Sequence, residues 1–471
     1  MSRRSSISQP ASLFSAQPYT VRLVSLGCAK NLVDAEVMCG SLATHGICLT
    51  TDAEVADLTL INTCGFIQSA RDEAERAIED AIRWKKSGRF KGLVRRVVVG
   101  GCLAQRSAPE YAARYPEVDC FIGIDDAPHI HEIVLRLARK TSSGAPEILV
   151  NAATPTWLYD DTAPRIQVTP PSYAYVKIAE GCNHRCAFCA IPGIRGNLRS
   201  RAPESVLAEC RQLLANGVRE LNLIAQDTTA YGFDFQPRQE LSALLRQIDA
   251  LPGEFWVRVL YTHPLHLTRE FLEILNGGKH LAPYLDVPLQ HIADPVLRSM
   301  RRGMTGEKTR SLLRGIREHY PDLVIRTTFM TGYPGETDEA FQELLDFVRE
   351  MKFDRLGAFA FSPEPGTPAA LIHDGLVSQA VAEERRKELL ELQKGISLHR
   401  NRAFVGKSMR VLVEERVRKG IWAARGTADA PEVDPRVMIH LSNGQRLEPG
   451  RFTTVQITQA DDYDLVARLL S

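Results

Sequence analysis

The chain has 471 residues, of which 44% are hydrophobic and 24% are charged, as in a globular protein of roughly two to four domains. Its net charge of +1 excludes a general electrostatic attraction to nucleic acid. No apolar run approaches the ~20 residues of a membrane span, and residues 1–20 lack the apolar core of a signal peptide. These absences predict a cytoplasmic protein with no membrane partner. Thiols stay reduced there, so the ten cysteines favour metal ligation or catalysis over disulfides.

The first part of the chain has the pattern of an α/β protein. Residues 1–20 are rich in Ser, Gln and Pro and predict a disordered leader. In residues 21–145, the apolar runs VRLVSLGC, DLTLINTCG and RRVVVGGC alternate with helical patterns, which predicts a doubly wound domain around a parallel sheet. Residues 146–171 are rich in Pro, Thr and Asp without helical periodicity, and we expect a linker there.

A cysteine ends the buried strand predicted in each of these three runs: Cys28, Cys64 and Cys102. Because the strand ends of an open parallel sheet meet in one crevice, we expect the three thiols to converge. Packing as small buried hydrophobes explains any one of them but poorly explains all three. The glycine beside each cysteine would allow the backbone to approach a bulky inorganic group. These glycines are Gly27, Gly65 and Gly101.

The alternation resumes from residue 172 to about 400 and predicts six parallel strands. They are expected near residues 173–180, 219–226, 255–262, 284–289, 323–332 and 355–361. Six β/α units are too few for a closed eight-fold barrel, so we predict a partial (β/α)6 barrel with its site at the C-terminal strand ends. A long helical pattern follows at 378–404. Residues 401–471 contain short alternating strands separated by Gly, Pro and Asn, which predict a small β-barrel.

A second group of three cysteines follows the first barrel strand, in the sequence EGCNHRCAFCAIPG. Cys182, Cys186 and Cys189 have the spacing C-x3-C-x2-C. Four thiolates would complete a tetrahedral zinc site or a [4Fe-4S] cluster, whereas three leave one cluster iron open. A zinc knuckle with His184 as a distant fourth ligand is the alternative. The spacing, the aromatic Phe188 before the last cysteine and the strand-loop context favour the cluster.

With these features, the segment resembles the radical SAM superfamily, in which the open iron binds the amino and carboxylate groups of S-adenosylmethionine (SAM). The resemblance implies that Phe188 and Gln226 line the SAM site, although LIAQDTTAYG departs from the usual Gly-Gly-Glu form. It also implies that Gly332, in IRTTFMTGYPGET, lets the backbone approach the adenine, and that Arg326 contacts a carboxylate. A core or surface arginine is the alternative for Arg326.

Further candidates are weaker. Gln290, His291 and Ser362, at the fourth and sixth strand ends, could face the reactants, and ordinary loop structure is the alternative. Among the other cysteines, Cys210 lies on an apolar helical stripe and is expected in the core. The remaining ones have apolar or helical surroundings that indicate packing. They are Cys39, Cys48 and Cys120.

Two cysteine groups in this order, followed by a small β-barrel, resemble the radical SAM methylthiotransferases over residues 21–471. That resemblance implies an auxiliary [4Fe-4S] cluster on Cys28, Cys64 and Cys102, a SAM cluster on the second group, and a C-terminal TRAM domain at 401–471. SLGCAKNLVDAE resembles the RimO branch, which modifies an aspartate of the twelfth small-subunit ribosomal protein, although Ala29 stands where that branch commonly has proline. The tRNA adenosine branch is the alternative.

Charge favours a protein substrate over tRNA. Residues 402–471 contain eleven Lys/Arg and nine Asp/Glu, a balance of +2, whereas a domain that binds tRNA should be distinctly basic. The acidic residues Asp429, Glu432 and Asp434 could face a basic ribosomal loop, and a solvated acidic turn is the default interpretation.

The chemistry explains the cofactors. The C–H bond at the β-carbon of aspartate is not acidic enough for a side-chain base, so a radical is required. The resemblance implies one SAM as radical source, a second as methyl donor, and electrons from a flavodoxin or ferredoxin. We expect a monomer. A non-catalytic zinc or iron-sulfur RNA-binding module is the more distant alternative.

Overall fold

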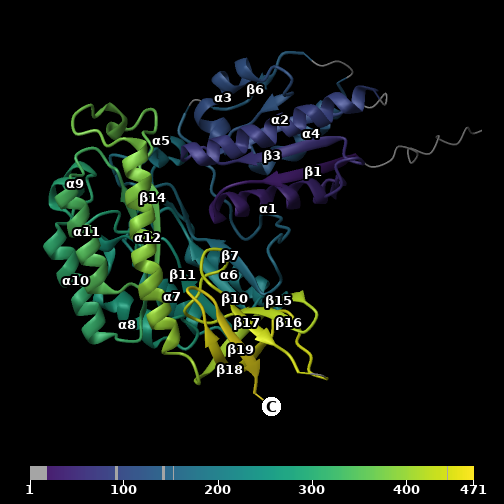
Figure 1. Ribbon diagram of the computed structural model, residues 1–471. Helices are drawn as coiled ribbons and strands as arrows, with labels where there is room; N and C mark the ends of the chain where they lie inside the picture. Colours follow the sequence, from purple (N-terminus) through teal and green to yellow (C-terminus); the bar gives the residue numbers. More distant parts are fainter. Residues whose placement is uncertain (1–18, 91–93, 141–143, 152, 443, 471) are drawn as a thin grey trace, which may run out of the picture.

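The computed structural model describes residues 19–90, 94–140, 144–151, 153–442 and 444–470. Figure 1 shows three bodies: an α/β domain at the N-terminus (upper right), a larger α/β body (left), and a small β-barrel at the C-terminus, below the N-terminal domain in this view. Most of the predicted leader lies outside the described residues; only Tyr19 and Thr20 are described, and Thr20 begins the first strand. Within the described ranges, no helix combines the length and apolar character needed to cross a bilayer.

The N-terminal domain is built on a six-stranded parallel sheet in the order β2-β1-β3-β4-β5-β6. Helices cover both faces, so the predicted doubly wound domain is confirmed. Helices α2 and α3 pack on one side with Ile78 and Leu103, and α1 and α4 pack on the other with Leu42 and Ile130. The strands are β1 Thr20–Ser25, β2 Cys48–Thr50, β3 Leu58–Thr63, β4 Arg96–Gly101, β5 Cys120–Phe121 and β6 Glu147–Ile148; the helices are α1 Ala29–Thr44, α2 Gln68–Phe90, α3 Cys102–Arg114 and α4 Ile130–Ala138.

The central body contains six parallel strands, as expected. They form two three-stranded sheets, β11-β10-β7 and β12-β13-β14, joined by a single bridge between Val257 and Leu281. Their buried side chains share one core with the flanking helices, which makes this a partial barrel. The strands are β7 Tyr173–Lys177, β10 Glu220–Ile224, β11 Trp256–Val259, β12 Tyr284–Asp286, β13 Val324–Thr331 and β14 Arg355–Ala360. The helices are α5 Ile191–Arg195, α6 Pro203–Ala215, α7 Leu241–Asp249, α8 Arg269–Gly277, α9 Asp294–Ser299, α10 Gly306–His319, α11 Asp338–Met351 and α12 Gln379–Arg402.

The C-terminal domain is a closed five-stranded barrel in the order β15-β16-β17-β19-β18. Three strands match the predicted alternating runs. The other two, β16 and β19, are short and carry weak alternation (IWAAR and LVARL), so only the closure of the barrel reveals them. The strands are β15 Ser408–Arg418, β16 Ile421–Arg425, β17 Val437–His440, β18 Phe452–Ala460 and β19 Leu465–Leu469.

Buried ion pairs join this barrel to the N-terminal ends of the central strands. Arg425 pairs with Glu220, the first residue of β10, at 2.7 Å, and with Glu414 at 2.7 Å. Glu220 also pairs with Arg258 at 2.8 Å, and all four side chains are almost wholly buried. The small barrel therefore covers the end of the central body opposite to the C-terminal strand ends, where sites of such barrels lie.

The predicted acidic turn is part of this joint, so neither interpretation of it was right for its buried members. Asp429 is 3% exposed and pairs with Arg355 at 2.5 Å. Asp434 accepts a hydrogen bond from Tyr284 and lies 3.4 Å from Arg326. Glu432 accepts hydrogen bonds from two tyrosines of β7. Buried carboxylates need such partners, which a sequence pattern does not reveal.

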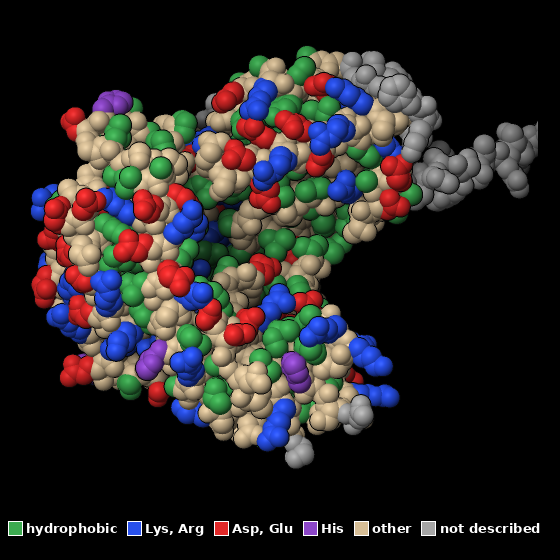
Figure 2. Space-filling model, in the orientation of Figure 1, with side chains coloured by type: hydrophobic (Ala, Val, Ile, Leu, Met, Phe, Trp, Pro, Cys, Tyr) green, Lys and Arg blue, Asp and Glu red, His purple; other side chains and the backbone are tan. Residues whose placement is uncertain are grey.

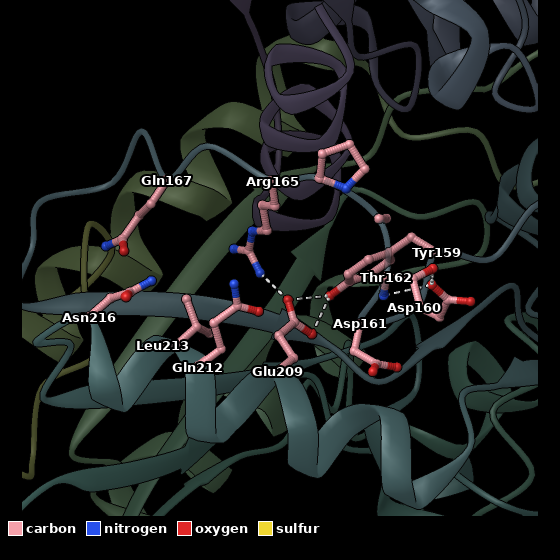
Figure 3. Close-up of a pocket in the computed structure, with 12 residues that line it drawn as sticks. Tyr159, Asp160, Asp161, Thr162, Arg165, Gln167, Glu209, Gln212, Leu213 and Asn216 are labelled. Atoms are coloured by element: carbon pink, nitrogen blue, oxygen red, sulfur yellow. Dashed lines mark hydrogen bonds and ion pairs between the residues drawn. The ribbon is translucent and has the colours of Figure 1, made fainter. Parts of the chain in front are cut away.

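The segment assigned to a linker is ordered where it is described. It supplies β6 to the N-terminal sheet, paired with β5. Further along, Arg165 pairs with Glu36 of α1 and with Glu209 of α6, and Tyr159 donates to Glu209 at 3.0 Å (Figure 3). Tyr159, Arg165 and Glu209 line a cavity of about 220 Å³, in which Figure 3 shows the arginine pointing at the carboxylate of Glu209. The ion pairs tie the two large domains together.

Candidate functional site

All six predicted cluster cysteines line one cavity of about 410 Å³ between the N-terminal domain and the C-terminal ends of the barrel strands. Two of the predicted SAM contacts, Phe188 and Gln226, line it as well. Figure 2 shows the surface hollowed where the N-terminal domain, the central body and the small barrel meet. Two separately folded domains thus bring together thiols that are far apart in the sequence.

The N-terminal thiols lie where strands give way to helices. Cys28 is the N-cap of α1, Cys64 follows β3, and Cys102 begins α3 directly after β4. Burial and the neighbouring thiols Cys102 and Cys28 raise the pKa of Cys64 to about 12. All three thiols border one cavity, and converging cysteine sulfurs are the usual ligands of an iron-sulfur cluster. The donor set therefore fits an iron-sulfur cluster.

The adjacent glycines serve a different purpose from the one expected. A Cβ on Gly27 would lie 2.5 Å from Cys64 Cβ, and one on Gly65 would lie 2.7 Å from Leu103 Cα. At Gly101 it would lie 2.5 Å from the carbonyl oxygen of Thr63. The space beside each glycine is filled by protein, so these residues allow the cysteine-bearing loops to approach one another rather than an inorganic group.

The second group lies on the loop between β8 (Ala179–Glu180) and α5. β8 pairs with β9 (Arg199–Ser200), and the amide of Cys182 donates to the carbonyl of Gly196 at 3.0 Å, which closes the base of the loop. Burial raises the pKa of Cys182 to about 11 and that of Cys189 to about 12. Arg302 lies 3.5 Å from the Cys186 sulfur and can partly neutralise a thiolate there. These donors also fit a cluster.

Polar atoms without partners face the same cavity. Gln226 donates from Nε2 to Glu180, but its buried Oε1 accepts no hydrogen bond within the described residues. Buried polar atoms are normally paired, so Oε1 fits an acceptor for a ligand's amino group. His263 Nε2 is also buried without a partner, and burial followed by the charge of Arg302 lowers the pKa of His263 to about 2. That ring is neutral.

A buried charge network connects the two cysteine groups. Arg195, on α5 of the barrel, is 1% exposed and lies 3.2 Å from the sulfur of Cys102 in the N-terminal domain. The same guanidinium pairs with Asp34 at 2.7 Å and with Glu180 at 3.0 Å. Lys177 also pairs with both acids. Although burial acts to raise it, Arg195 and Lys177 lower the pKa of Glu180, so the acid stays ionised.

Comparison with known proteins follows this three-part division. Residues 20–123 match the model described as "Uncharacterized protein family UPF0004", residues 176–348 match the Radical SAM superfamily, and residues 405–470 match the TRAM domain. The chain is 43% identical to "Ribosomal protein uS12 methylthiotransferase RimO" of Heliobacterium modesticaldum, over 96% of this chain and 95% of that protein. It is 42% identical to the protein of the same name from Geobacter sulfurreducens, over 96% and 98%.

The chain belongs to the RimO methylthiotransferase family. It is a radical SAM enzyme, whose cofactors are SAM and a [4Fe-4S] cluster. The fold resembles the radical SAM methyltransferase TsrM from Kitasatospora setae in its structure with cobalamin and a [4Fe-4S] cluster, with a TM-score of 0.54 at 16% identity, covering 75% of this chain and 74% of that one.

Arg326, expected at the SAM site, lies elsewhere in this family member. It pairs with Asp286 at 2.9 Å and with Asp434 of the TRAM domain at 3.4 Å, and it does not line the cavity. We expect Arg326→Met to lower the free energy of unfolding by about 3 kcal/mol, because it leaves two buried carboxylates without a cation. Denaturant unfolding measures this loss. SAM affinity should be unchanged, and a large drop in affinity would restore Arg326 as a ligand contact.

Gly332 is also not among the residues that line the cavity. Its φ is +75°, and a Cβ there would overlap Ala382 and lie 2.9 Å from that residue's Cα. The glycine therefore lets α12 pack against the end of β13. We expect Gly332→Ala to destabilise the protein by about 3 kcal/mol through overpacking and a left-handed backbone.

Gly335 provides the matched control for this substitution. It has a φ of +86° and nothing within 4 Å of its Cβ position. Gly335→Ala should cost only about 1 to 2 kcal/mol, since it adds backbone strain without a clash. Thermal unfolding of both variants tests the difference. Equal losses would show that the contact with Ala382 does not matter.

Only one of the three weaker candidates at the strand ends lines the cavity. Gln290 lines the cavity with a φ of +74°, whereas His291 and Ser362 are not among its lining residues. Ser362 donates instead to Glu364 at 3.2 Å. Among the other cysteines, Cys48 is exposed, so the expectation that it packs inside was wrong; the short edge strand β2 places its side chain in solvent.

Several cavity residues were missed. Lys30 lies two residues after Cys28, and its ammonium stands 3.2 Å from the ring centre of Tyr261, a residue with a φ of 62°. His184, considered only as a zinc ligand, donates a hydrogen bond from Nε2 to the carboxylate of Asp227 at 2.8 Å. In the sequence, the only indication that Lys30 and His184 line the cavity is that they lie within two residues of a predicted cluster ligand. Non-glycine residues in such strained conformations are concentrated at functional sites.

Proposed function

We propose that this enzyme transfers a methylthio group to the β-carbon of an aspartate in ribosomal protein uS12. The convergence of both cysteine groups on one cavity supports this proposal most strongly, because the reaction needs a radical source and a sulfur carrier beside the same substrate atom. The names of the relatives, similar over nearly their whole length, support uS12 as the substrate.

The second cofactor belongs to this proposal. We assign an auxiliary [4Fe-4S] cluster to Cys28, Cys64 and Cys102, beside the SAM cluster on Cys182, Cys186 and Cys189. Three thiolates leave one iron of each cluster open to a reactant. When bound, the clusters and two SAM molecules supply a carbon radical and an activated methylthio group.

The chain's own residues bind and orient these groups. Gln226 Oε1 is the acceptor for the SAM amino group, and Phe188 provides an apolar wall beside the SAM cluster. Lys30 and Tyr261 form a cation-π pair at the wall of the cavity. Because the cavity is formed between two domains, a bound substrate closes it and excludes water from the reactive carbon.

The rival substrate is a tRNA adenosine. The total charge of the TRAM domain no longer distinguishes the two, because the side chains of Glu414, Arg425, Asp429 and Asp434 are buried and do not contribute to its exposed surface. The choice between uS12 and tRNA as the substrate therefore rests on the names of the similar proteins. We also propose that the enzyme is a cytoplasmic monomer that takes electrons from a flavodoxin or a ferredoxin.

Incubation of the anaerobically reconstituted enzyme with uS12, SAM and a reductant tests the proposal. We expect a methylthio mass increase on one aspartate of uS12 and none on tRNA. The same increase on an adenosine of tRNA, with unmodified uS12, would assign the enzyme to the tRNA branch. A colourless, zinc-containing protein that never cleaves SAM would indicate the RNA-binding module.

A further inference from the structure

A second hollow lies behind the SAM-cluster loop. This rear groove has a volume of about 800 Å³ and lies between α3, residues 150, 151, 153 and 154 after β6, α5 and the loop after β14. Figure 1 shows α5 at this junction. Cys186 and Cys189 line both the groove and the reaction cavity, whereas the three N-terminal cysteines line only the cavity. Two of the three cysteines of the loop therefore border both hollows, and the third borders the reaction cavity without bordering the groove.

The charged residues that line the groove are all basic. They are Arg106, Arg185 and Arg301. Arg185 and Arg301 are exposed and form no ion pair with an acidic side chain among the described residues. Arg106 pairs with the buried Glu364 at 3.0 Å, but Glu364 also pairs with Arg71, so this group keeps a net positive charge. The groove has an uncompensated positive field directly beside two cluster ligands.

The rest of the lining is mostly small and apolar, and includes Ala104, Ala108, Pro109, Ala190, Pro192 and Pro368. Such residues leave room for a flat apolar edge, and the arginines attract carboxylates around that edge. A flavodoxin has this combination, since it exposes the edge of its flavin at the strand ends of an acidic α/β protein. A reactant would need both cysteine groups, which only the cavity offers.

We infer that the rear groove is the docking site of a reduced, acidic flavodoxin that delivers electrons to the SAM cluster. One electron passes from the flavin to the cluster through the side formed by Cys186 and Cys189. The flavin is oxidised by one electron and the cluster is reduced by one, with no transfer of atoms. The inference rests on the proposed function for the cluster on this loop and for a flavodoxin or ferredoxin as the class of electron donor.

Charge reversal tests this site in the full-length, reconstituted enzyme. We expect Arg185→Glu and Arg301→Glu each to slow cluster reduction by reduced flavodoxin about tenfold at low ionic strength, and the double variant to slow it further. The difference from the unmodified enzyme should shrink as salt is added. Stopped-flow absorbance and electron paramagnetic resonance measure the reduced cluster directly, without reference to product.

Two controls make the result specific. Arg416→Glu changes an exposed arginine of β15, at the far end of the molecule, and should leave the rate unchanged. Dithionite, a small reductant that needs no docking site, should reduce the Arg301→Glu and Arg416→Glu variants at the rate of the unmodified enzyme and support the same SAM cleavage. Iron content, measured for each variant, should also be equal.

Several outcomes would overturn the inference. An unchanged flavodoxin rate in the double variant would do so, as would an equal slowing in Arg416→Glu. Loss of dithionite-driven cleavage would show that the arginines serve the cluster loop itself. Faster, arginine-dependent reduction by an acidic ferredoxin would replace flavodoxin as the partner. Absence of product on uS12 would reject the proposed function and leave the docking result intact.

Discussion

Replacing Cys64 with serine should leave SAM cleavage in place and abolish methylthio transfer. Cys64 lines the shared cavity but belongs to the N-terminal group, far in sequence from the SAM-cluster loop. Losing one of three thiolates should release the auxiliary cluster, so we expect about half of the iron to disappear. Iron analysis, 5′-deoxyadenosine formation and the mass of uS12, measured on one anaerobic preparation, separate these effects.

Two further substitutions serve as controls for Cys64→Ser. Cys182→Ser should remove SAM cleavage and product together, since it affects the radical source. Cys48→Ser, at an exposed cysteine outside the cavity, should change neither iron content nor activity. Full iron content and normal product formation in Cys64→Ser would show that only one cluster operates, and the two-cluster proposal would fail.

Arg195→Met should cost about 3 to 5 kcal/mol of unfolding free energy, the usual penalty for removing one partner of a buried ionic network. Asp34 and Glu180 would then share Lys177 as their only remaining cation in this network. The contact with the Cys102 sulfur would also be lost, so cluster retention should fall about 10- to 100-fold, as for other groups that support metal ligands. Denaturant unfolding and iron release to a chelator measure the two effects.

The conservative variant Arg195→Lys distinguishes charge from geometry. It keeps a cation between the two acids but lacks the planar fork that contacts both a carboxylate and the sulfur. We expect it to recover most of the stability and little of the cluster retention. Arg269→Met, at a surface pair with Glu273, should leave the free energy of unfolding essentially unchanged, because solvent screens an exposed ion pair. Wild-type behaviour of Arg195→Met would mean that the network is dispensable.

The features that the sequence predicted are those with local signals. The six barrel strands follow from apolar runs at regular intervals, and the cysteines at strand ends follow from parallel-sheet geometry. The features that it did not predict depend on contacts between distant segments. Arg326 has no local signal that separates a SAM ligand from a partner of Asp434, more than 100 residues away in the chain. Gly332 likewise gives no sign of its contact with Ala382.

The acidic turn of the TRAM domain shows that the sequence also does not predict which charged side chains are buried. A run of Asp and Glu in a turn is usually solvated, and only the folded chain shows that Asp429 is covered by Arg355. The charge count of a domain therefore describes its surface only when its interfaces are known. In this chain the interface between the TRAM domain and the central body buries charged side chains of both signs, among them Arg425 and Asp429.

The buried ion pairs between the TRAM domain and the central body also affect how a truncated enzyme can be interpreted. Deleting the last 71 residues would remove Arg425 and Asp429, so that Arg355 would lose its carboxylate and the exposed Glu220 would keep only Arg258. Such a shortened enzyme would lose activity through damage to its scaffold, whatever the TRAM domain recognises. Substrate recognition by that domain is better examined with point changes on its outward strands, where the catalytic body stays whole.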